Sequence, residues 1–453
     1  MSPARLALAA FAALALVPTC ASAVELDDPV SQWLPSSDSA DWVYGWADSA
    51  YSPETRQEHV TVQARSGNAF RLAWTEPNPP SDQSPSSGYM DFQRTDAGLV
   101  NLNYQSTPAP SEFPILCASP TSCGNSLAGT YHLLIWGTRS PTLAEPLLKG
   151  TRWSSLGGAS NDVASDNRYL GTQKIVVPAF PAGVEASVVQ SSITQAGALG
   201  DPYGSGVRTV WWVYGVGPVK IIFEHAGGER TETDLQSTSL TPEPAPADTN
   251  LLPLLRGRSA TFRWRNSRHM KSWSVQKFTV SQVVNNSARV DVASVKGPIK
   301  VAGGYVFSTR LSGVTNLSAT TKAASKAKFP PLGPKSVPIS DRRHFFTPYD
   351  LMVYGFNPVL TIGPATGDTW RSSREGRDWQ VFGVTGQSRV LAPRKIRTPA
   401  GTYTAVGIRS TLLQAKFPFG SGTRTSWFAD GVGLVKLVFR HNDGSVSTVE
   451  RTK

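Results

Sequence analysis

Residues 420–441 read "GSGTRTSWFADGVGLVKLVFRH", and residues 204–225 read "GSGVRTVWWVYGVGPVKIIFEH". The two segments align without a gap at an offset of 216 residues, and 13 of their 22 positions are identical. The similarity continues in the same order upstream, where "GYMDFQRTDAGLVNL" from Gly88 resembles "GYVFSTRLSGVTNLS" from Gly304. Self-similarity at a fixed offset is the signature of an internally repeated unit, so we expect the chain to contain two copies of one domain.

Each copy of this segment has the pattern of a β-hairpin. In the second copy, period-two alternation places Val435, Leu437 and Phe439 on one face of a strand and Lys436 and Arg440 on the other. The preceding turn is rich in glycine, which permits a positive φ. These turn glycines are Gly215 and Gly217 in the first copy and Gly431 and Gly433 in the second. A further turn, "HNDGS", predicts a three-stranded meander at the end of the second copy.

The composition and the repeats together divide the chain into domains. We expect a first β domain over residues 24–240, a Pro-rich linker over 241–250, and a second β domain over 251–453. The expected fold class is mainly β, with two tandem curved antiparallel sheets or half-barrels and few short helices. Residues 320–328 are the one segment that we expect to form a short basic helix.

The run "TPAGTYTAV", followed by a strand and then "SWFADGVGLVK", resembles a motif of exported bacterial lipoprotein-like domains. These domains are similar to the lipoprotein-carrier superfamily, typified by the outer-membrane lipoprotein chaperones. The resemblance implies a curved half-barrel, partly closed by short helices, whose concave side receives acyl chains. The first copy departs from the motif at Val213 and Tyr214, and the resemblance transfers no catalytic residue.

The beginning of the chain predicts export. Arg5, a short apolar run and the small residues Ala21-Ser22-Ala23 fit a signal peptide over residues 1–23. Cys20 leaves open a cleavage before that cysteine with lipid attachment. Cys117 and Cys123 lie close together in "CASPTSC", and in an exported chain this spacing predicts a local disulfide.

The charge is divided unequally between the copies. Residues 24–250 contain 12 Lys and Arg against 24 Asp and Glu, whereas residues 251–453 contain 31 against 9. The formal net charges are therefore −12 and +22. The second copy interleaves cations with aromatic residues in "RWRNSRHMKSWSVQKF", which predicts a face for an anionic envelope polymer or a membrane surface rather than for nucleic acid. The cations of this predicted face are Arg263, Arg265, Arg268, Lys271 and Lys277.

The sequence contains no cluster of acids, bases and nucleophiles with catalytic or metal-ligand spacing. We therefore expect a protein that is not an enzyme and that needs no metal or cofactor. Aromatic residues beside the hairpin turns are candidates to line an apolar site in a concave sheet, although packing in the core and at the barrel rim is the favoured explanation for them. These candidates are Trp211, Trp212, Tyr214, Trp427 and Phe428.

These patterns favour an exported, non-enzymatic protein of the cell envelope that binds an apolar or amphiphilic ligand or an anionic envelope polymer. A structural scaffold of a surface complex remains the alternative, and an envelope hydrolase is a third, disfavoured class. A periplasmic, extracellular or cell-surface location fits each of these. The ligand and the oligomeric state are left open.

Overall fold

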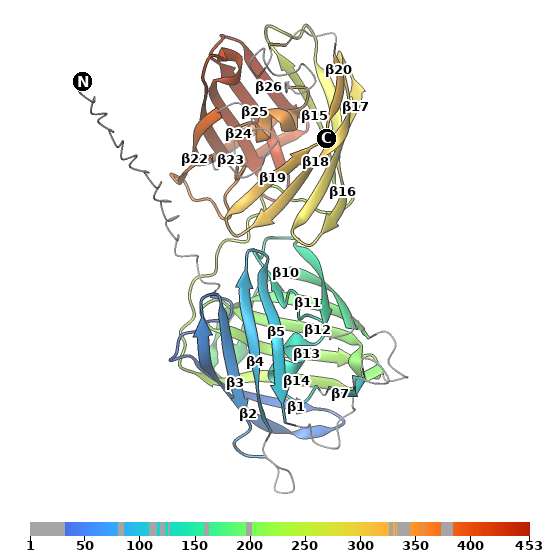
Figure 1. The fold of residues 1–453 in the computed structure, drawn as a ribbon, viewed down its shortest axis with the longest axis vertical. Coiled ribbons are helices and arrows are strands. Elements are labelled where there is room, and N and C mark those ends of the chain that lie inside the picture. The colour runs from blue at the N-terminus through green and yellow to red at the C-terminus, as the bar shows by residue number, and fades with distance from the viewer. Residues whose placement is uncertain are drawn as a thin grey trace, which may run out of the picture. The chain divides into compact units, whose positions relative to one another are not determined.

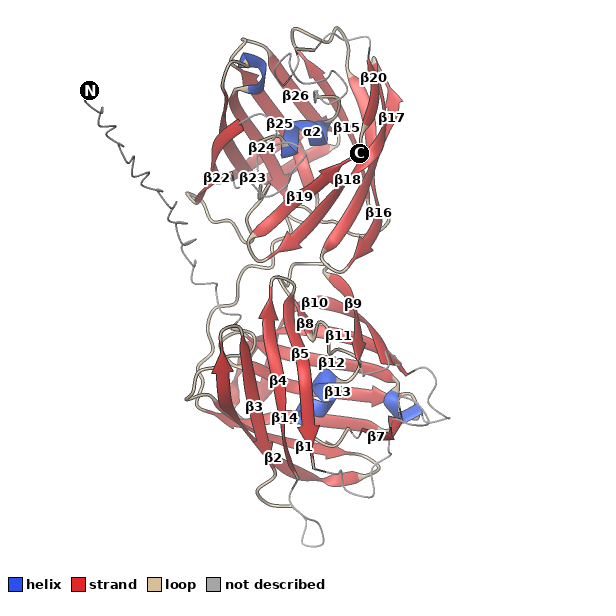
Figure 2. Cartoon of the chain, viewed as in Figure 1, coloured by secondary structure: helices blue, strands red, loops and turns tan. Residues whose placement is uncertain are grey.

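A computed structural model of the chain describes residues 32–79, 86–107, 116–117, 123–125, 127–157, 163–195, 202–325, 329–330, 332, 345–355, 357–372 and 384–453. Two antiparallel sheets of twelve strands each make up most of these residues. In Figure 1 the first sheet is coloured from blue to green and the second from yellow to red. The expected mainly β architecture with few short helices is confirmed (Figure 2).

The strands of the first sheet are β1 Asp41–Asp48, β2 Ser52–Ser66, β3 Ala69–Thr75, β4 Ser87–Thr95, β5 Gly98–Ser106, β8 Leu143–Ala144, β9 Arg152–Gly157, β10 Val163–Val177, β11 Phe180–Gln195, β12 Gly206–Val213, β13 Gly217–His225 and β14 Arg230–Thr238. A separate two-stranded sheet pairs β6 Leu116–Cys117 with β7 Cys123–Asn125. The helical segments of this half are α1 Thr130–Ile135 and the 3₁₀ turn η1 Pro202–Gly204.

The strands of the second sheet are β15 Ser259–Asn266, β16 Ser274–Val284, β17 Ser287–Lys296, β18 Ile299–Arg310, β19 Gly313–Ala319, β20 Lys322–Ser325, β21 Thr369–Arg371, β22 Val384–Thr398, β23 Gly401–Gln414, β24 Gly422–Ala429, β25 Gly433–His441 and β26 Val446–Arg451. Its helical segments are α2 Pro348–Val353 and the 3₁₀ turn η3 Pro418–Gly420.

The two sheets have the same strand order. Apart from β8, which pairs with β5, and β20, which pairs with β18, the first runs β5-β4-β3-β2-β1-β14-β13-β12-β11-β10-β9 and the second runs β19-β18-β17-β16-β15-β26-β25-β24-β23-β22-β21. The equivalent hairpins also share their register, because Trp211 pairs with Lys220 and Trp427 pairs with Lys436. The 22-residue segments that are alike in sequence therefore occupy the same place in two sheets of the same topology.

One local expectation was wrong. Residues 320–328 were expected to form a short helix, but Lys322–Ser325 is the strand β20. It pairs antiparallel with β18, so that Ser325 lies opposite Ile299. Pairing with an existing sheet edge outweighs the weak helix propensity of four residues.

Each sheet packs one face, the inner face, against its own hydrophobic core. In the first core the largest buried side chains include Trp42, Tyr44 and Trp212, and in the second they include Trp264 and Phe262. The short helices α1 and α2 lie against β13 and β25, and Figure 2 draws α2 against its sheet. The core thus fills the inner side of both sheets with aromatic side chains.

A buried arginine ties each short helix to its sheet. Arg424, on the inner face of β24, donates from Nη1 to the main-chain oxygens of Leu351 and Tyr354 at the end of α2, at 2.7 and 2.8 Å. Arg208 makes the same bonds to Leu133 and Trp136 at the end of α1. Burial lowers the pKa of each arginine to about 9, so both stay protonated at neutral pH.

A buried histidine lies at the equivalent position in each half, as the last residue of β13 and of β25. His441 Nδ1 contacts the main-chain oxygen of Phe419 at 2.6 Å, and its Nε2 contacts the Ser447 hydroxyl at 2.8 Å. His225 makes the equivalent contacts with Tyr203 and Thr231. The next partner differs: in the first half Thr231 donates to the Asp48 carboxylate, whereas in the second Asn266 donates to Ser447.

The turn glycines adopt positive φ. The φ values are 83° at Gly215, 116° at Gly217, 63° at Gly431 and 96° at Gly433. Replacing Gly431 with valine is therefore expected to cost about 1–2 kcal/mol of stability, because a β-branched residue is strained in the left-handed region. A Cβ at this position would meet no atom within 4 Å, so the cost is one of backbone conformation alone.

We expect Asp430→Ala to cost less than Gly431→Val, because Asp430 contributes only one hydrogen bond, 2.9 Å from the main-chain nitrogen of Asn250. Gly431→Asn is the matched control, since asparagine tolerates the left-handed region. Thermal melts of the three variants test this order. Equal melting temperatures for Gly431→Val and Gly431→Asn would contradict the expectation.

Candidate functional site

The outer face of the second sheet, opposite the core, carries a group of exposed arginines from four strands. We call this group the basic face and define it as Arg265 on β15, Arg389 and Arg394 on β22, Arg409 on β23 and Arg440 on β25. Arg389 and Arg409 lie directly opposite each other in the β22–β23 pairing. Like charges placed opposite each other across two strands destabilise a sheet, so this arrangement has no evident value for folding.

Acidic residues do not neutralise the basic face. Across the described ranges, none of its five arginines forms an ion pair. The carboxylate of Glu450, on β26 between β15 and β25, is paired with Lys436 at 3.0 Å and with Arg263 at 2.6 Å. Burial opposes ionisation of Glu450, but the bonds from these two cations outweigh it and hold its pKa below the usual value.

The first sheet has no such face at the same positions. Gln190 replaces Arg409 there and accepts a hydrogen bond from Arg168, the counterpart of Arg389, at 3.1 Å. Glu224 stands in place of Arg440. Lys220 bonds to both Glu232 and Asp234. At these positions Arg168 and Lys220 of the first sheet have hydrogen-bond acceptors, whereas the arginines of the basic face have no ion-pair partner in the described residues.

A groove crosses the basic face. Its volume is about 480 Å³, and its lining includes Arg394, Arg409, Arg440, the Thr423 and Thr425 side chains, and Trp427. The register explains why these residues meet, because Arg409 pairs with Thr425 and Arg440 pairs with Thr423. Three guanidinium groups, two threonines and an indole on one surface form a site rich in hydrogen-bond donors, without a carboxylate in its lining.

Trp427 differs from its counterpart in one hydrogen bond. Trp211 Nε1 donates to Gln173 Oε1 at 3.1 Å in the first sheet. Trp427 Nε1 is buried and has no partner among the residues that the structure describes. The guanidinium of Arg394 lies 4.9 Å from the centre of the Trp427 ring, in a cation–π contact.

The aromatic residues predicted to line an apolar site have two different environments. Trp212 and Phe428 are each 1% exposed and belong to the two main cores. Tyr214 packs edge-on against Trp33 at 5.0 Å. Trp211 and Trp427 lie on the outer faces, and Trp427 lines the groove. The structure therefore brings one of the five predicted aromatic residues to the candidate site.

The cations predicted from "RWRNSRHMKSWSVQKF" are dispersed. Arg265 belongs to the basic face and lies 4.8 Å from the Trp273 ring. Arg263 is bound to Glu450, and Arg268 lies 3.8 Å from Asp443. Lys271 and Lys277 are exposed, outside the groove lining. The four other arginines of the basic face were missed; they lie in "QSRVLAPRKIR", "GIRSTLL" and "FRHND". The odd spacing of Arg389 and Arg394 hides their common face, because a bulge falls between Leu391 and Arg394.

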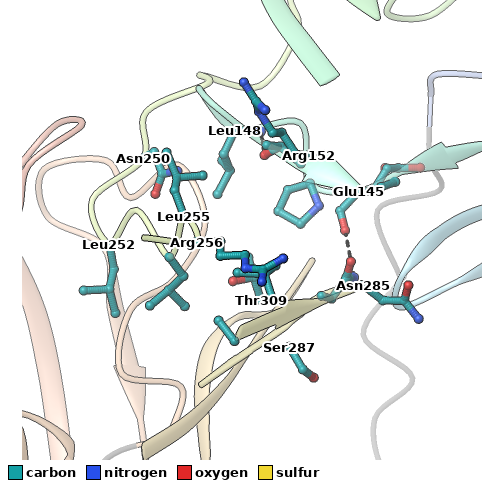
Figure 3. Close-up of a pocket in the computed structure, with 17 residues that line it drawn as sticks. Glu145, Leu148, Arg152, Asn250, Leu252, Leu255, Arg256, Asn285, Ser287 and Thr309 are labelled. Atoms are coloured by element: carbon teal, nitrogen blue, oxygen red, sulfur yellow. Dashed lines mark hydrogen bonds between the residues drawn. The ribbon is translucent and has the colours of Figure 1, made fainter. Parts of the chain in front are cut away.

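A second cavity, of about 420 Å³, is drawn in Figure 3. Its apolar wall includes Leu148, Leu252 and Leu255, and its polar lining includes Arg152 and Arg256. Asn286 Nδ2, which also lines it, donates to the main-chain oxygen of Glu145 at 3.4 Å. This cavity contains none of the residues singled out in the sequence.

Other predicted features are only partly within the described residues. Cys117 and Cys123 lie opposite each other in the β6–β7 pairing, but their side chains are outside the described part, so the disulfide stays a prediction. The signal peptide and Cys20 also lie outside it. Within the described ranges no cluster of three or more His, Cys, Asp or Glu could hold a metal ion, and no helix has the length and apolar character needed to cross a membrane. The Asp48 and His225 side chains, 3.9 Å apart, are 0% exposed.

No family model and no curated protein sequence matches the chain. Among solved structures, it is similar to a candidate lipoprotein of Parabacteroides distasonis, with 11% identity and a TM-score of 0.23 over 46% of this chain and 98% of the other. A candidate exported protein of Bacteroides fragilis with a YmcC-like fold has 12% identity and a TM-score of 0.21 over 45% and 98%. MucB, in its complex with MucA from Pseudomonas aeruginosa, has 11% identity and a TM-score of 0.21 over 67% and 92%.

Proposed function

We propose that this protein is an exported, non-enzymatic protein of the cell envelope that binds an anionic envelope polymer through the basic face. The observation that carries the proposal is the set of five exposed arginines without ion-pair partners in the described residues. Uncompensated like charges cost stability and attract polyanions, so their value lies in binding. The export part rests on the predicted signal peptide over residues 1–23.

Duplication followed by divergence of charge accounts for the two halves. The equal strand order, the equal register at Trp211 and Trp427, and the equivalent arginines Arg208 and Arg424 support descent from one domain. The differences between Gln190 and Arg409 and between Glu224 and Arg440 support polyanion binding by the second copy. An apolar ligand in the sheet concavity is not part of the proposal, because Trp212 and Phe428 fill the cores.

The proposal is tested by measuring the affinity of the full chain for immobilised long-chain polyphosphate at two salt concentrations. We expect the Arg409→Gln/Arg440→Gln variant to bind at least tenfold more weakly, because two charge-assisted contacts are lost, and to show a smaller dependence on salt. Added salt should weaken the wild-type complex steeply, since binding releases counterions.

The matched control is Arg168→Gln/Arg230→Gln, which removes the same charge from the outer face of the first sheet. We expect its affinity to stay within about twofold of the wild type, because these arginines already have partners in Gln190 and Glu232. Equal losses in both double variants, or binding that does not respond to salt, would show that the basic face is not the binding surface.

A further inference from the structure

The groove on the basic face differs from the first sheet at one specific contact. Gln173 lies opposite Ala186, and Arg394 lies opposite Ala405. Each alanine is two residues before the residue that pairs with the tryptophan, which is Val188 in the first sheet and Gly407 in the second. Gln173 and Arg394 therefore hold the same place relative to their tryptophans.

This exchange removes an acceptor and adds a donor. Gln173 offers its amide oxygen to Trp211 Nε1, whereas a guanidinium has no acceptor atom to offer to Trp427. Trp427 is 7% exposed, and its N–H is left without a partner among the described residues. A buried donor without an acceptor is destabilising, because it has lost its hydrogen bond to water. A ligand oxygen in the groove would supply the missing acceptor.

The surrounding groups specify the charge of that ligand. Arg394 lies over the Trp427 ring, and Arg409 and Arg440 line the same groove. Arg394 is exposed, and Leu391, which also lines the groove, is half-buried. The groove therefore places the indole N–H of Trp427, which lacks an acceptor, beside arginines that have no ion-pair partner among the described residues.

We infer that the groove binds a phosphate group, with Trp427 Nε1 donating to one oxygen and Arg394 and Arg409 donating to the others. The inference rests on the proposed function, since the phosphate would belong to the envelope polymer. A single arginine fork already satisfies a planar carboxylate. Donors from β22, β23 and β24 instead suit a tetrahedral group, whose oxygens point in several directions.

The test follows the indole N–H signal of Trp427 by nuclear magnetic resonance in the full-length protein labelled with ¹⁵N-tryptophan. The signal is assigned by its loss in Trp427→Phe. Inorganic phosphate is expected to shift this signal in a saturable manner, and acetate at the same ionic strength is expected to shift it much less. The Trp211 signal should respond to neither, because Gln173 already accepts its hydrogen bond.

Arg394→Gln is the decisive variant, because it restores the acceptor that the first sheet has. We expect it to abolish the phosphate-induced shift and to weaken polyphosphate binding at least tenfold. Arg265→Gln, which removes the same charge elsewhere on the basic face, should leave the shift intact and weaken binding about threefold or less. The contrast separates a specific loss from a general loss of charge.

The possible results distinguish this inference from the proposed function. Polyphosphate binding that depends on the basic face, without a phosphate shift at Trp427, would overturn the phosphate site and leave the proposed function standing. A phosphate shift at Trp427 without polyphosphate binding would support the site and overturn the proposed polymer. Equal shifts with acetate and phosphate would overturn the assignment of phosphate chemistry.

Discussion

Replacing Arg424 with methionine is expected to lower the free energy of unfolding of the second half by about 3–5 kcal/mol. The side chain is 3% exposed and holds the carbonyl oxygens of Leu351 and Tyr354. Methionine fills much of the same space but donates no hydrogen bond, so two buried acceptors lose their partner. The six-residue helix α2 is too short to persist without this anchor.

The measurement is urea unfolding of the full chain, with pulse proteolysis to separate the fragments of the two halves. Arg440→Met is the matched control, since Arg440 is exposed on the adjacent strand, and it should change stability by no more than about 0.5 kcal/mol. Arg208→Met should act in the same way on the first half. If Arg424→Met proves as stable as the wild type, relief from burying the charge balances the lost bonds and the anchoring role is wrong.

Acidification from pH 6.5 to pH 4 is expected to destabilise the second half by about 3 kcal/mol through His441 alone. Burial lowers the pKa of His441 from its ordinary value of 6.5 to about 4. Between these two values the unfolded chain binds a proton that the folded chain does not, so stability falls as the pH falls. Below about pH 4 both states are protonated and this contribution stops changing.

The geometry explains why His441 stays neutral. Its Nδ1–H donates to the Phe419 carbonyl and its Nε2 accepts from Ser447, between the rings of Phe419 and Phe439. Asp443 favours the charged form and His269 opposes it, but burial is the larger effect. Unfolding at pH 7, 6, 5 and 4.5 checks the slope. His441→Gln should be less stable at pH 7 and should lose the slope above pH 4.5, and an unchanged slope would exclude His441 as its source.

The hairpins and their turns could be predicted from the sequence, because their signals are local. Alternation at Leu437 and Phe439, and glycine at 431 and 433, specify two strands and the turn between them. Val435 was expected on the same face as Leu437, which is wrong: it packs with Trp427 instead, because a bulge interrupts the alternation there. The helices α1 and α2 could not be predicted, since six residues carry too little periodicity. Arg424 was equally hidden, because an arginine in a strand ordinarily indicates a solvent-exposed face.

The candidate site was predicted in part. The surplus of cations in residues 251–453 indicated an anionic partner, but the run around Arg263 contributes only Arg265 to the basic face. Arg394, Arg409 and Arg440 come from three strands that meet only through the sheet register. A single sequence does not reveal that register, and the loss of an acceptor for Trp427 becomes visible only when both sheets are compared.

The position of the chain ends within each sheet has a consequence for folding kinetics. The first and last strands of each half are neighbours in the middle of their sheet, where β1 pairs with β14 and β15 with β26. Trp42 thus meets Thr238, and Phe262 meets Arg451, across almost the whole length of a half. Such contacts give a high contact order, which slows folding. In each half the sheet therefore stays divided into two unjoined groups of strands until the last strand has been synthesised.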